Sequence, residues 1–195
     1  MPSRRRVPVV VAVLAAVGAV LLVVGCAAPS PTAGAPAGPP PAVVTGAGQT
    51  DPTAPVSVRV PAIDVARDDV QRLGLTADGT AEVPADYDRV GWFAGGAGRG
   101  PTVLLGHVDS RTGPAVFYRL RDLRPGDVVE VGRADGTTAR YAVTRTEQVA
   151  KDRFPTFAVF GAVRGDVLRL VTCAGEFDRG ARSYTDNLVV HTIRT

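Results

Sequence analysis

One stretch near the C-terminal end of the chain, residues 167–175, reads VLRLVTCAG. Its first seven residues are mostly apolar and β-branched, and Gly175 interrupts the pattern soon after Cys173, so we expect a β-strand that ends at the cysteine. Side chains alternate between the two faces of a strand, which places Arg169 and Cys173 on one face and Thr172 on the other. A cysteine at a strand end, on a face that also carries an arginine, is less typical of an inert core residue.

Short runs of the same character recur along the chain and are separated by turn signals rich in Gly, Pro and Asp. We expect strands at residues 56–60, 69–75, 102–107, 127–131, 138–149, 167–173 and 187–193. The sequence shows no long stretch of helical periodicity, and one short helix is expected at 114–123. Many short strands with Gly and Pro between them predict an all-β fold, either a closed antiparallel barrel or a sandwich.

The composition is that of one folded domain with additions. The chain has 195 residues, of which 45% are hydrophobic and 21% are charged, which argues against disorder of the whole chain and against a multispanning membrane protein. Arg4, Arg5 and Arg6 account for the whole excess of 22 basic over 19 acidic residues. The remainder is therefore neutral, and the pI of about 9.2 is no sign of nucleic acid binding, so we expect no nucleic-acid partner.

The N-terminal residues have the pattern of an export signal. Residues 7–25 carry no charge and follow directly on the three arginines, and a helix of that length nearly crosses a hydrocarbon core of about 30 Å. Arginines on this side alone keep the N-terminus inside the cell. Residues 23–26, VVGC, resemble a lipobox, so Cys26 is either a lipidated N-terminus or an incidental residue of a transmembrane anchor. Both alternatives place the rest of the chain on the outer face of the plasma membrane.

Three regions follow from these patterns: a signal or membrane-anchor segment at 1–26, a linker at 27–55 and a folded domain at 56–195. The linker holds eight of the sixteen prolines together with much Ala and Gly. This composition predicts a disordered, extended extracellular spacer. The domain is long enough to bury a single hydrophobic core.

A cysteine and a histidine terminate two of the expected strands. Cys173 is the one cysteine of the domain, so it has no disulfide partner there and is either a buried small hydrophobe or a functional thiol. His107 ends the apolar run at 103–106, and Gly106 leaves room for close approach just before it. The two side chains can therefore meet at one rim of a barrel. His191 lies within the last expected strand and is interpreted as a packed or surface histidine.

Such a pair of residues has a defined chemistry. The thiolate of a cysteine is a nucleophile, and a neighbouring imidazole can take the thiol proton and later protonate a leaving amine. Acyl transfer also develops an oxyanion, which an arginine can stabilise with its planar fork of donors. The segment after Cys173 supplies Arg179 and Arg182. We find no acidic cluster suited to calcium and no Cys/His spacing suited to zinc, so we expect neither a metal nor a cofactor.

The domain resembles the sortases, the cysteine transpeptidases of Gram-positive cell surfaces, and among them the actinobacterial class F group. Six segments carry the resemblance, in order along the domain: VRVPAI at 58–63, GWF at 91–93, GHVD at 106–109, FYRL at 117–120, LRPGD at 123–127 and LVTC at 170–173. The sequence departs from the pattern at two places. Thr185 stands where some relatives carry a basic residue, and Ala174-Gly175 stands where Gly-Gly is common.

The resemblance implies a closed eight-stranded sortase-type β-barrel with one or two short helices. His107 and Cys173 match the family's catalytic histidine and nucleophile, and we choose Arg182 as the match for its arginine, with Arg179 as the alternative. We also expect Thr172 and Arg169 to bind substrate. Such an enzyme cuts an LPXTG-like sorting signal of a secreted protein between Thr and Gly. It holds a thioacyl intermediate on the cysteine and passes the acyl group to an amine, usually on a peptidoglycan precursor.

Three other interpretations remain open. A cell-wall L,D-transpeptidase also uses cysteine and histidine, but its usual Ser-His-Gly-Cys block is absent around Cys173. A non-catalytic surface lipoprotein or binding module would suit Cys26 and the linker, and would bury Cys173. A hydrolase on the same fold would release the acyl group to water instead of passing it to an amine.

Overall fold

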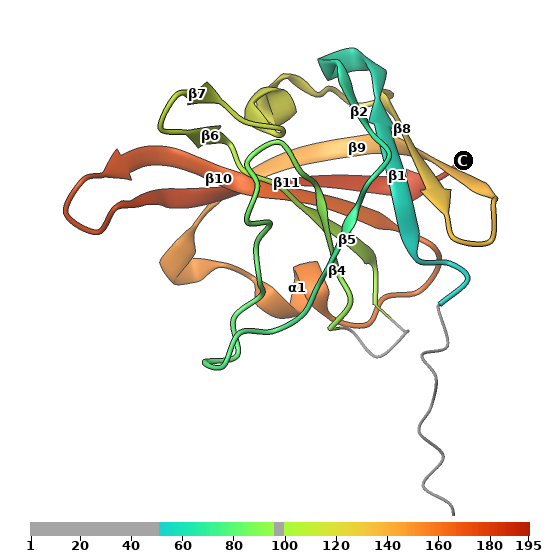
Figure 1. Cartoon of the computed structure of the whole chain (residues 1–195), viewed down its shortest axis with the longest axis horizontal. Coiled ribbons are helices and arrows are strands. Elements are labelled where there is room, and N and C mark those ends of the chain that lie inside the picture. Colours follow the sequence, from blue (N-terminus) through green and yellow to red (C-terminus); the bar gives the residue numbers. More distant parts are fainter. Residues whose placement is uncertain (1–50, 96–99) are drawn as a thin grey trace, which may run out of the picture. The chain divides into compact units, whose positions relative to one another are not determined.

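The computed structural model describes residues 51–95 and 100–195 (Figure 1). The predicted export segment and the linker up to residue 50 lie outside the described residues. Within the described part, no helix is long and apolar enough to span a membrane. The two described ranges belong to one compact unit.

One nine-stranded sheet organises the domain, with its strands in the order β2-β1-β8-β9-β11-β10-β5-β4-β3. The strands are β1 (Pro55–Val60), β2 (Val65–Arg67), β3 (Gln71–Leu73), β4 (Gly91–Phe93), β5 (Thr102–Leu105), β8 (Val128–Arg133), β9 (Thr138–Ala150), β10 (Leu168–Asp178) and β11 (Ser183–Arg194). A separate two-stranded sheet pairs β6 (Asp109–Ser110) with β7 (Gly113–Pro114). Short helices lie in the connections: η1 (Pro61–Ile63), η2 (Tyr118–Asp122), η3 (Lys151–Arg153) and α1 (Thr156–Phe160).

The prediction of an all-β fold with few short helices is confirmed, but the closed eight-stranded barrel is not. The sheet has nine strands in an open order, with β2 and β3 at its two ends. These edge strands are linked by residues 68–70 alone, so the sheet curls until its edges approach each other. In this link, the Val70 N–H donates to Val56 O at 3.2 Å, and the Gln71 N–H that follows donates to Val90 O at 2.9 Å. A covalent connection therefore joins the two edges where a hydrogen-bonded ladder would close a barrel.

The predicted runs locate the long strands better than the short ones. Six of them coincide in large part with β1, β5, β8, β9, β10 and β11. The seventh, at 69–75, is a strand only over its central three residues, and the similarly short β2 and β4 were not predicted. Three residues are too few to show an alternation of apolar and polar side chains. The helix expected at 114–123 is present as the shorter 3-10 helix η2.

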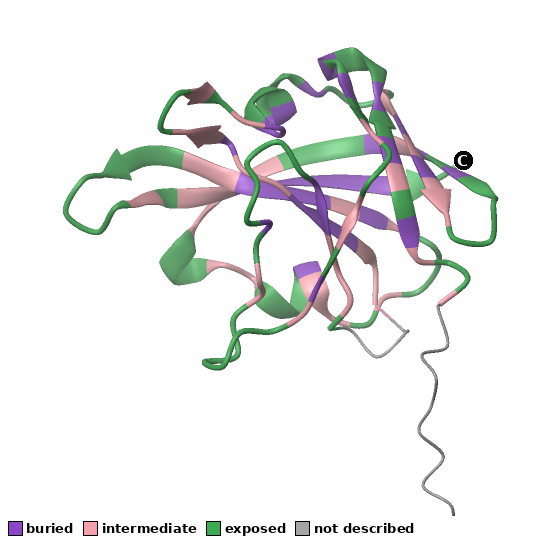
Figure 2. Ribbon diagram, viewed as in Figure 1, coloured by how far each residue is buried: buried purple, intermediate pink, exposed green. Residues whose placement is uncertain are grey.

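The sheet carries a hydrophobic layer on each face, and Figure 2 shows the buried residues concentrated along its middle strands. Along β5, Leu104 belongs to the large inner cluster around Phe117, whereas Val103 and Leu105 belong to a smaller outer cluster that includes Val159 of α1. The same division holds in β10, where residues 168 and 170 are inner and residue 171 is outer. This is the alternation expected for residues 167–173. Two buried faces fix the register of these central strands, because a slip of one residue would exchange the two layers.

His191 is buried in β11 among charged neighbours. It pairs with Arg169 across the β10–β11 ladder, and its Nε2 lies 3.1 Å from Glu147 Oε2, which also accepts from Arg145 at 2.6 Å. Burial and the positive charges of Arg169 and Arg145 lower the pKa of His191 to about 4, while Glu147 acts in the opposite direction. The fold therefore holds this packed histidine in its neutral form.

We predict that His191 makes the stability of the domain depend on pH. Above about pH 6.5 the imidazole is neutral in both states, but between about pH 6.5 and about pH 4 only the unfolded chain takes up the proton, so the free energy of unfolding falls. His191→Gln keeps an N–H for Glu147 without titrating. Its melting temperature should fall less than that of the wild type between about pH 7 and about pH 5. Equal losses in the two proteins would contradict this assignment.

Candidate active site

The parallel pairing of β5 with β10 brings His107 and Cys173 to the same end of these two strands. Leu105 and Val171 form the last residue pair of this ladder, and the Gly106 N–H donates to Val171 O at 3.2 Å. Cys173 follows that pair by two residues within β10, and His107 follows it by two residues just beyond the end of β5. If the alternation of β5 continues past its last residue, both side chains lie on the outer face. Neighbouring strands lie about 4.8 Å apart. From this register we expect the imidazole and the thiol to lie close together.

His107 and Cys173 line a cavity of about 590 Å³, which we call the histidine cavity. Three aromatic rings form part of its wall, those of Tyr87, Phe177 and Tyr184. Arg182 reaches the same cavity from the turn between β10 and β11. Cys173 is a free thiol and is partly exposed. Three of the predicted site residues are thus brought together, around a thiol that solvent reaches.

Two contacts orient the imidazole of His107. Its Nε2 lies 2.7 Å from the backbone carbonyl oxygen of Pro84, and its ring centroid lies 4.7 Å from that of Tyr87. A carbonyl oxygen can only accept a hydrogen bond, so Nε2 carries the proton of the neutral ring. Nδ1 is then the nitrogen that is able to take up a further proton. The backbone carbonyl thereby favours the tautomer with the proton on Nε2, which leaves Nδ1 as the unprotonated nitrogen.

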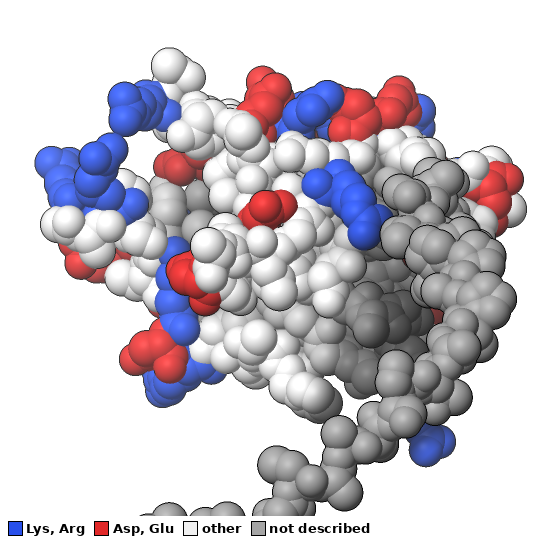
Figure 3. Space-filling model, turned by 60° about the horizontal axis from the view of Figure 1, so that its bottom comes forward, with Lys and Arg blue, Asp and Glu red and all other residues white. Residues whose placement is uncertain are grey.

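Arg182 is held in the β10–β11 turn in a left-handed backbone conformation, with a φ of 52°. Asp178 shapes this turn, since its Oδ1 accepts from the N–H of Gly180 at 2.7 Å. The end of the hairpin is tied to η3, because Lys151 Nζ donates to Ser183 Oγ at 2.7 Å. Figure 3 shows basic side chains gathered at the end of the molecule from which this hairpin projects (left). The turn thus presents a guanidinium to the histidine cavity.

A second cavity, of about 400 Å³, also has Cys173 in its wall, and we call it the threonine cavity. Thr172 and Leu188 line it from the sheet, and Tyr118 and Arg121 line it from η2. Thr172 is 5% exposed, and its hydroxyl has no hydrogen-bond partner among the residues that the structure describes. The predicted site residue Thr172 therefore lies next to the cysteine in the chain but faces a different cavity from His107.

Tyr184 and Asp109 line both cavities, and the phenol of Tyr184 donates a hydrogen bond to the carboxylate of Asp109. Asp109 lies two residues after His107, so this bond links the histidine segment to β11. The bond raises the pKa of Tyr184 to about 12, with smaller contributions from burial and from the charges of Asp109 and Cys173, against which the charge of Arg121 acts. Sequence analysis missed this pair, although Asp109 is the last residue of the GHVD segment at 106–109.

Arg169 is brought to neither cavity. It lies four residues before Cys173 on the same strand, which at about 3.3 Å per residue is about 13 Å away. In the β10–β11 ladder, Arg169 pairs with His191. Its Nε is buried without a hydrogen-bond partner within the described ranges. Burial and the charge of Arg145 lower the pKa of Arg169. The substrate-binding role expected for Arg169 therefore has no support in the geometry, because alternation gave the face correctly but not the distance along the strand.

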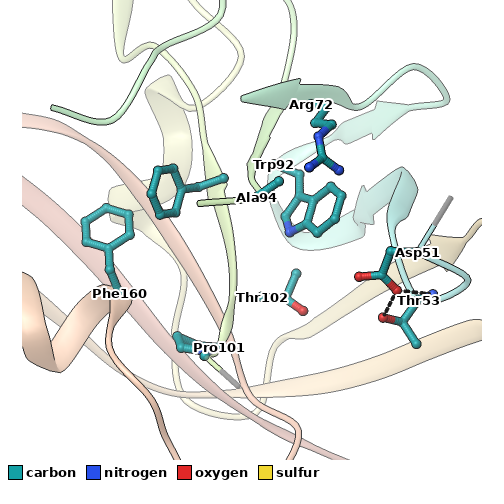
Figure 4. A pocket seen from close by; sticks show the side chains of 10 residues that line it. Asp51, Thr53, Arg72, Trp92, Ala94, Pro101, Thr102 and Phe160 are labelled. Atoms are coloured by element: carbon teal, nitrogen blue, oxygen red, sulfur yellow. Dashed lines mark hydrogen bonds between the residues drawn. The ribbon is translucent and has the colours of Figure 1, made fainter. Parts of the chain in front are cut away.

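A third cavity, of about 250 Å³, is lined by residues at the end of β5 opposite His107 (Figure 4). Trp92, Thr102 and Phe160 line it, and the guanidinium of Arg72 lies 5.5 Å from the centroid of the Trp92 ring. No cysteine or histidine is among its lining residues. Across residues 51–95 and 100–195, no group of three or more His, Cys, Asp or Glu side chains is arranged to hold a metal ion. The side chains with nucleophilic and basic chemistry concentrate at the Cys173 end of the sheet.

The sequence matches a family model, and the fold is similar to solved structures. A family model described as a sortase domain matches residues 58–195. Among solved structures, the chain is similar to sortase C of Streptococcus pneumoniae, with 22% identity and a TM-score of 0.52 over 71% of this chain and 64% of that one. It is also similar to a lid mutant of sortase A from Corynebacterium diphtheriae, with 21% identity and a TM-score of 0.52 over 72% of this chain and 70% of that one.

The chain spans less than two thirds of the pneumococcal protein. At such identities the likeness to the solved structures concerns the fold alone. No curated protein matches the sequence.

Gly106 is required by the packing directly before His107. An alanine Cβ at this position would lie 2.6 Å from Phe117 Cδ2 and 2.8 Å from Val116 Cγ1, and both of these side chains are buried. Gly106→Ala should therefore lower the free energy of unfolding by about 1–3 kcal/mol in a denaturant titration. Gly74→Ala is the control, because its Cβ would meet nothing closer than Glu82 Oε2 at 3.5 Å. Equal stability of the two variants would contradict this account of Gly106.

Proposed function

The chain belongs to the sortase family, as the match over residues 58–195 shows, and on this premise we propose that it is a cysteine transpeptidase with Cys173 as its nucleophile. One observation supports the proposal: His107 and Cys173 follow the last pair of the parallel β5–β10 ladder by two residues each, and both line one cavity that Arg182 also lines. We propose further that it is a class F enzyme whose substrates are secreted proteins with an LPXTG-like sorting signal. The partial exposure of Cys173 favours this role over that of a buried structural cysteine.

In the first half-reaction, Nδ1 of His107 takes the thiol proton, and the sulfur of Cys173 adds to the carbonyl carbon of the Thr–Gly bond. The carbonyl oxygen becomes an oxyanion, which the guanidinium of Arg182 stabilises. When this intermediate collapses, the C–N bond breaks and the proton on Nδ1 passes to the leaving amine. The acyl group remains on Cys173 as a thioester.

In the second half-reaction, an incoming amine adds to the thioester carbonyl and gives a proton to Nδ1 of His107. The C–S bond then breaks, and the sulfur of Cys173 recovers the proton. The acceptor is the amine of a peptidoglycan precursor or another cell-wall amine. If water reached the thioester before the amine, the same steps would give hydrolysis, so access to the histidine cavity decides between the two outcomes.

We propose that the enzyme works at the outer face of the plasma membrane. Residues 1–26 would tether it there, either as a single membrane anchor or through a lipidated Cys26, and residues 27–55 would form the extracellular linker to the catalytic domain at 56–195. The charge-free run at 7–25 behind Arg4–Arg6 supports this location.

The nucleophile and its partner can be tested by mass spectrometry of the full-length protein after incubation with an LPXTG-type peptide. An adduct equal to the peptide fragment that ends in Thr should map to Cys173 and not to Cys26. Cys173→Ala should abolish this adduct, and His107→Ala should slow its formation about a thousandfold. His191→Gln, which changes the other histidine, is the matched control and should still form it. A wild-type rate in His107→Ala would contradict the proposed pair.

The arginine can be tested in the same assay. Arg182→Lys should slow adduct formation about tenfold or more, because lysine keeps the charge but lacks the planar fork of donors. Arg179→Lys changes the same turn at a residue that lines neither the histidine nor the threonine cavity, and should stay within about twofold of the wild type. The reverse result, with Arg182→Lys near normal and Arg179→Lys slow, would move the role to Arg179.

A further inference from the structure

Arg121 is a second guanidinium at the cysteine, and it belongs to the threonine cavity. Its Nε donates to Tyr118 O at 3.1 Å, and its guanidinium carbon lies 4.5 Å from the centroid of the Tyr118 ring. The stacking and the hydrogen bond hold the planar group in place. Its two Nη groups have no hydrogen-bond or ion-pair partner in the part of the chain that the structure describes. A positioned fork of donors is therefore free to bind an acceptor in the cavity.

The neighbouring Arg119 shows that the helix does not leave its arginines unpaired in general. Arg119 Nη1 lies 2.5 Å from Asp64 Oδ2, and its Nε lies 3.2 Å from Asp122 Oδ2. Arg119 also lines a different cavity, away from Cys173. Two arginines of one short helix thus have different surroundings, and Arg121 is the one that lines the cavity of the nucleophile.

The hydroxyl of Thr172 is an independent sign that the threonine cavity binds a polar ligand. It is buried at 5% exposure and lacks a partner within the described residues. A buried hydroxyl without a partner is unfavourable and rare in native proteins. Phe117 and Leu188 line the same cavity, together with the amide of Gln148. The hydroxyl of Thr172 is therefore available to a polar ligand that enters the cavity.

The one carboxylate in the wall of this cavity is already engaged, since Asp109 accepts the phenol of Tyr184. Gln148 also lines the cavity, and its Nε2 already donates to Asp186 Oδ2 at 2.6 Å. The donors that remain free in the wall are the Nη groups of Arg121 and the hydroxyl of Thr172. Such a set suits a neutral or anionic acceptor and repels a cation. Carbonyl oxygens are the acceptors that a peptide substrate offers.

We propose that Arg121 and Thr172 bind carbonyl oxygens of the acyl half of the peptide donor while Cys173 attacks it. This inference rests on the proposed function. As the C–S bond forms and the C–N bond breaks, His107 supplies the proton to the leaving amine, and Arg121 only donates hydrogen bonds and exchanges no proton. Arg121 is then a substrate-binding residue of the acylation step, in addition to Arg182 in the histidine cavity.

The first test asks whether the charge of Arg121 reaches Cys173, and it needs no peptide. In full-length protein carrying Cys26→Ala, the thiol reacts with an anionic sulfonatoethyl thiosulfonate and with a cationic trimethylammonioethyl thiosulfonate, and the ratio of the two rates is measured. Arg121→Gln should lower the anionic-to-cationic ratio about two- to threefold, as for the loss of one charge in the wall of the same cavity in a water-like dielectric. Arg119→Gln should leave the ratio unchanged. An unchanged ratio in Arg121→Gln would overturn the proposal.

The second test measures acylation from a subsaturating LPXTG-type peptide. Arg121→Gln should slow adduct formation about tenfold to a hundredfold, and Arg121→Lys should recover only part of the rate. Thr172→Val, which removes the hydroxyl at nearly the same volume, should slow it in the same direction. The partition of the finished thioester between amine and water should stay at the wild-type value in Arg121→Gln, which a general distortion of the site would change.

The two proposals fail in different ways. If the wild type forms the adduct and Arg121→Gln forms it at the same rate, the role of Arg121 is wrong and the transpeptidase stands. If the wild type forms no adduct, the proposed function is wrong, and the ratio of thiosulfonate rates still decides whether Arg121 acts on Cys173.

Discussion

The chemistry of this protein depends on one hydrogen-bonded ladder, the parallel pairing of β5 with β10. Four residue pairs, from Thr102 with Leu168 to Leu105 with Val171, fix the register of the two strands. This register positions His107 and Cys173 at the wall of the histidine cavity. A slip by one residue would send one of them to the inner face. The buried layers on both faces of the two strands oppose such a slip. Hydrophobic packing in the middle of the sheet therefore fixes the positions of His107 and Cys173 at the ends of the strands.

A large part of this arrangement could be predicted from the sequence, because the decisive residues stand at the ends of apolar runs. The run before His107 and the run before Cys173 are long enough to show their strand character, and each is ended by a change of composition. Alternation then gives the faces of β10 correctly. The choice of Arg182 gained a geometric reason only in the structure, where it lines the histidine cavity and Arg179 does not.

The remaining features depend on contacts between distant parts of the chain, which spacing does not encode. Arg121 lies in a five-residue helix that carries three charged residues, and the sequence gives no reason to separate it from Arg119. The hydrogen bond between Tyr184 and Asp109 joins residues far apart in sequence. The open order of the sheet follows from strands of three residues, whose pairing is set by the curl of the whole sheet. Arg169 shares a face of β10 with Cys173 but lines neither the histidine nor the threonine cavity, so a shared face does not by itself imply a shared site.

The most direct measurement of the central claim is a disulfide between positions 107 and 173. In full-length protein carrying Cys26→Ala and His107→Cys, strand neighbours about 4.8 Å apart should allow a disulfide to form with Cys173 under mild oxidation, detected by loss of the two thiol hydrogens and by peptide mapping. The account predicts rapid formation of this bond, and slower formation from Leu105→Cys, which pairs with Val171 instead. If His107→Cys stays reduced under conditions that oxidise Leu105→Cys, the register of β5 and β10 is wrong and the proposed pair of catalytic residues falls with it.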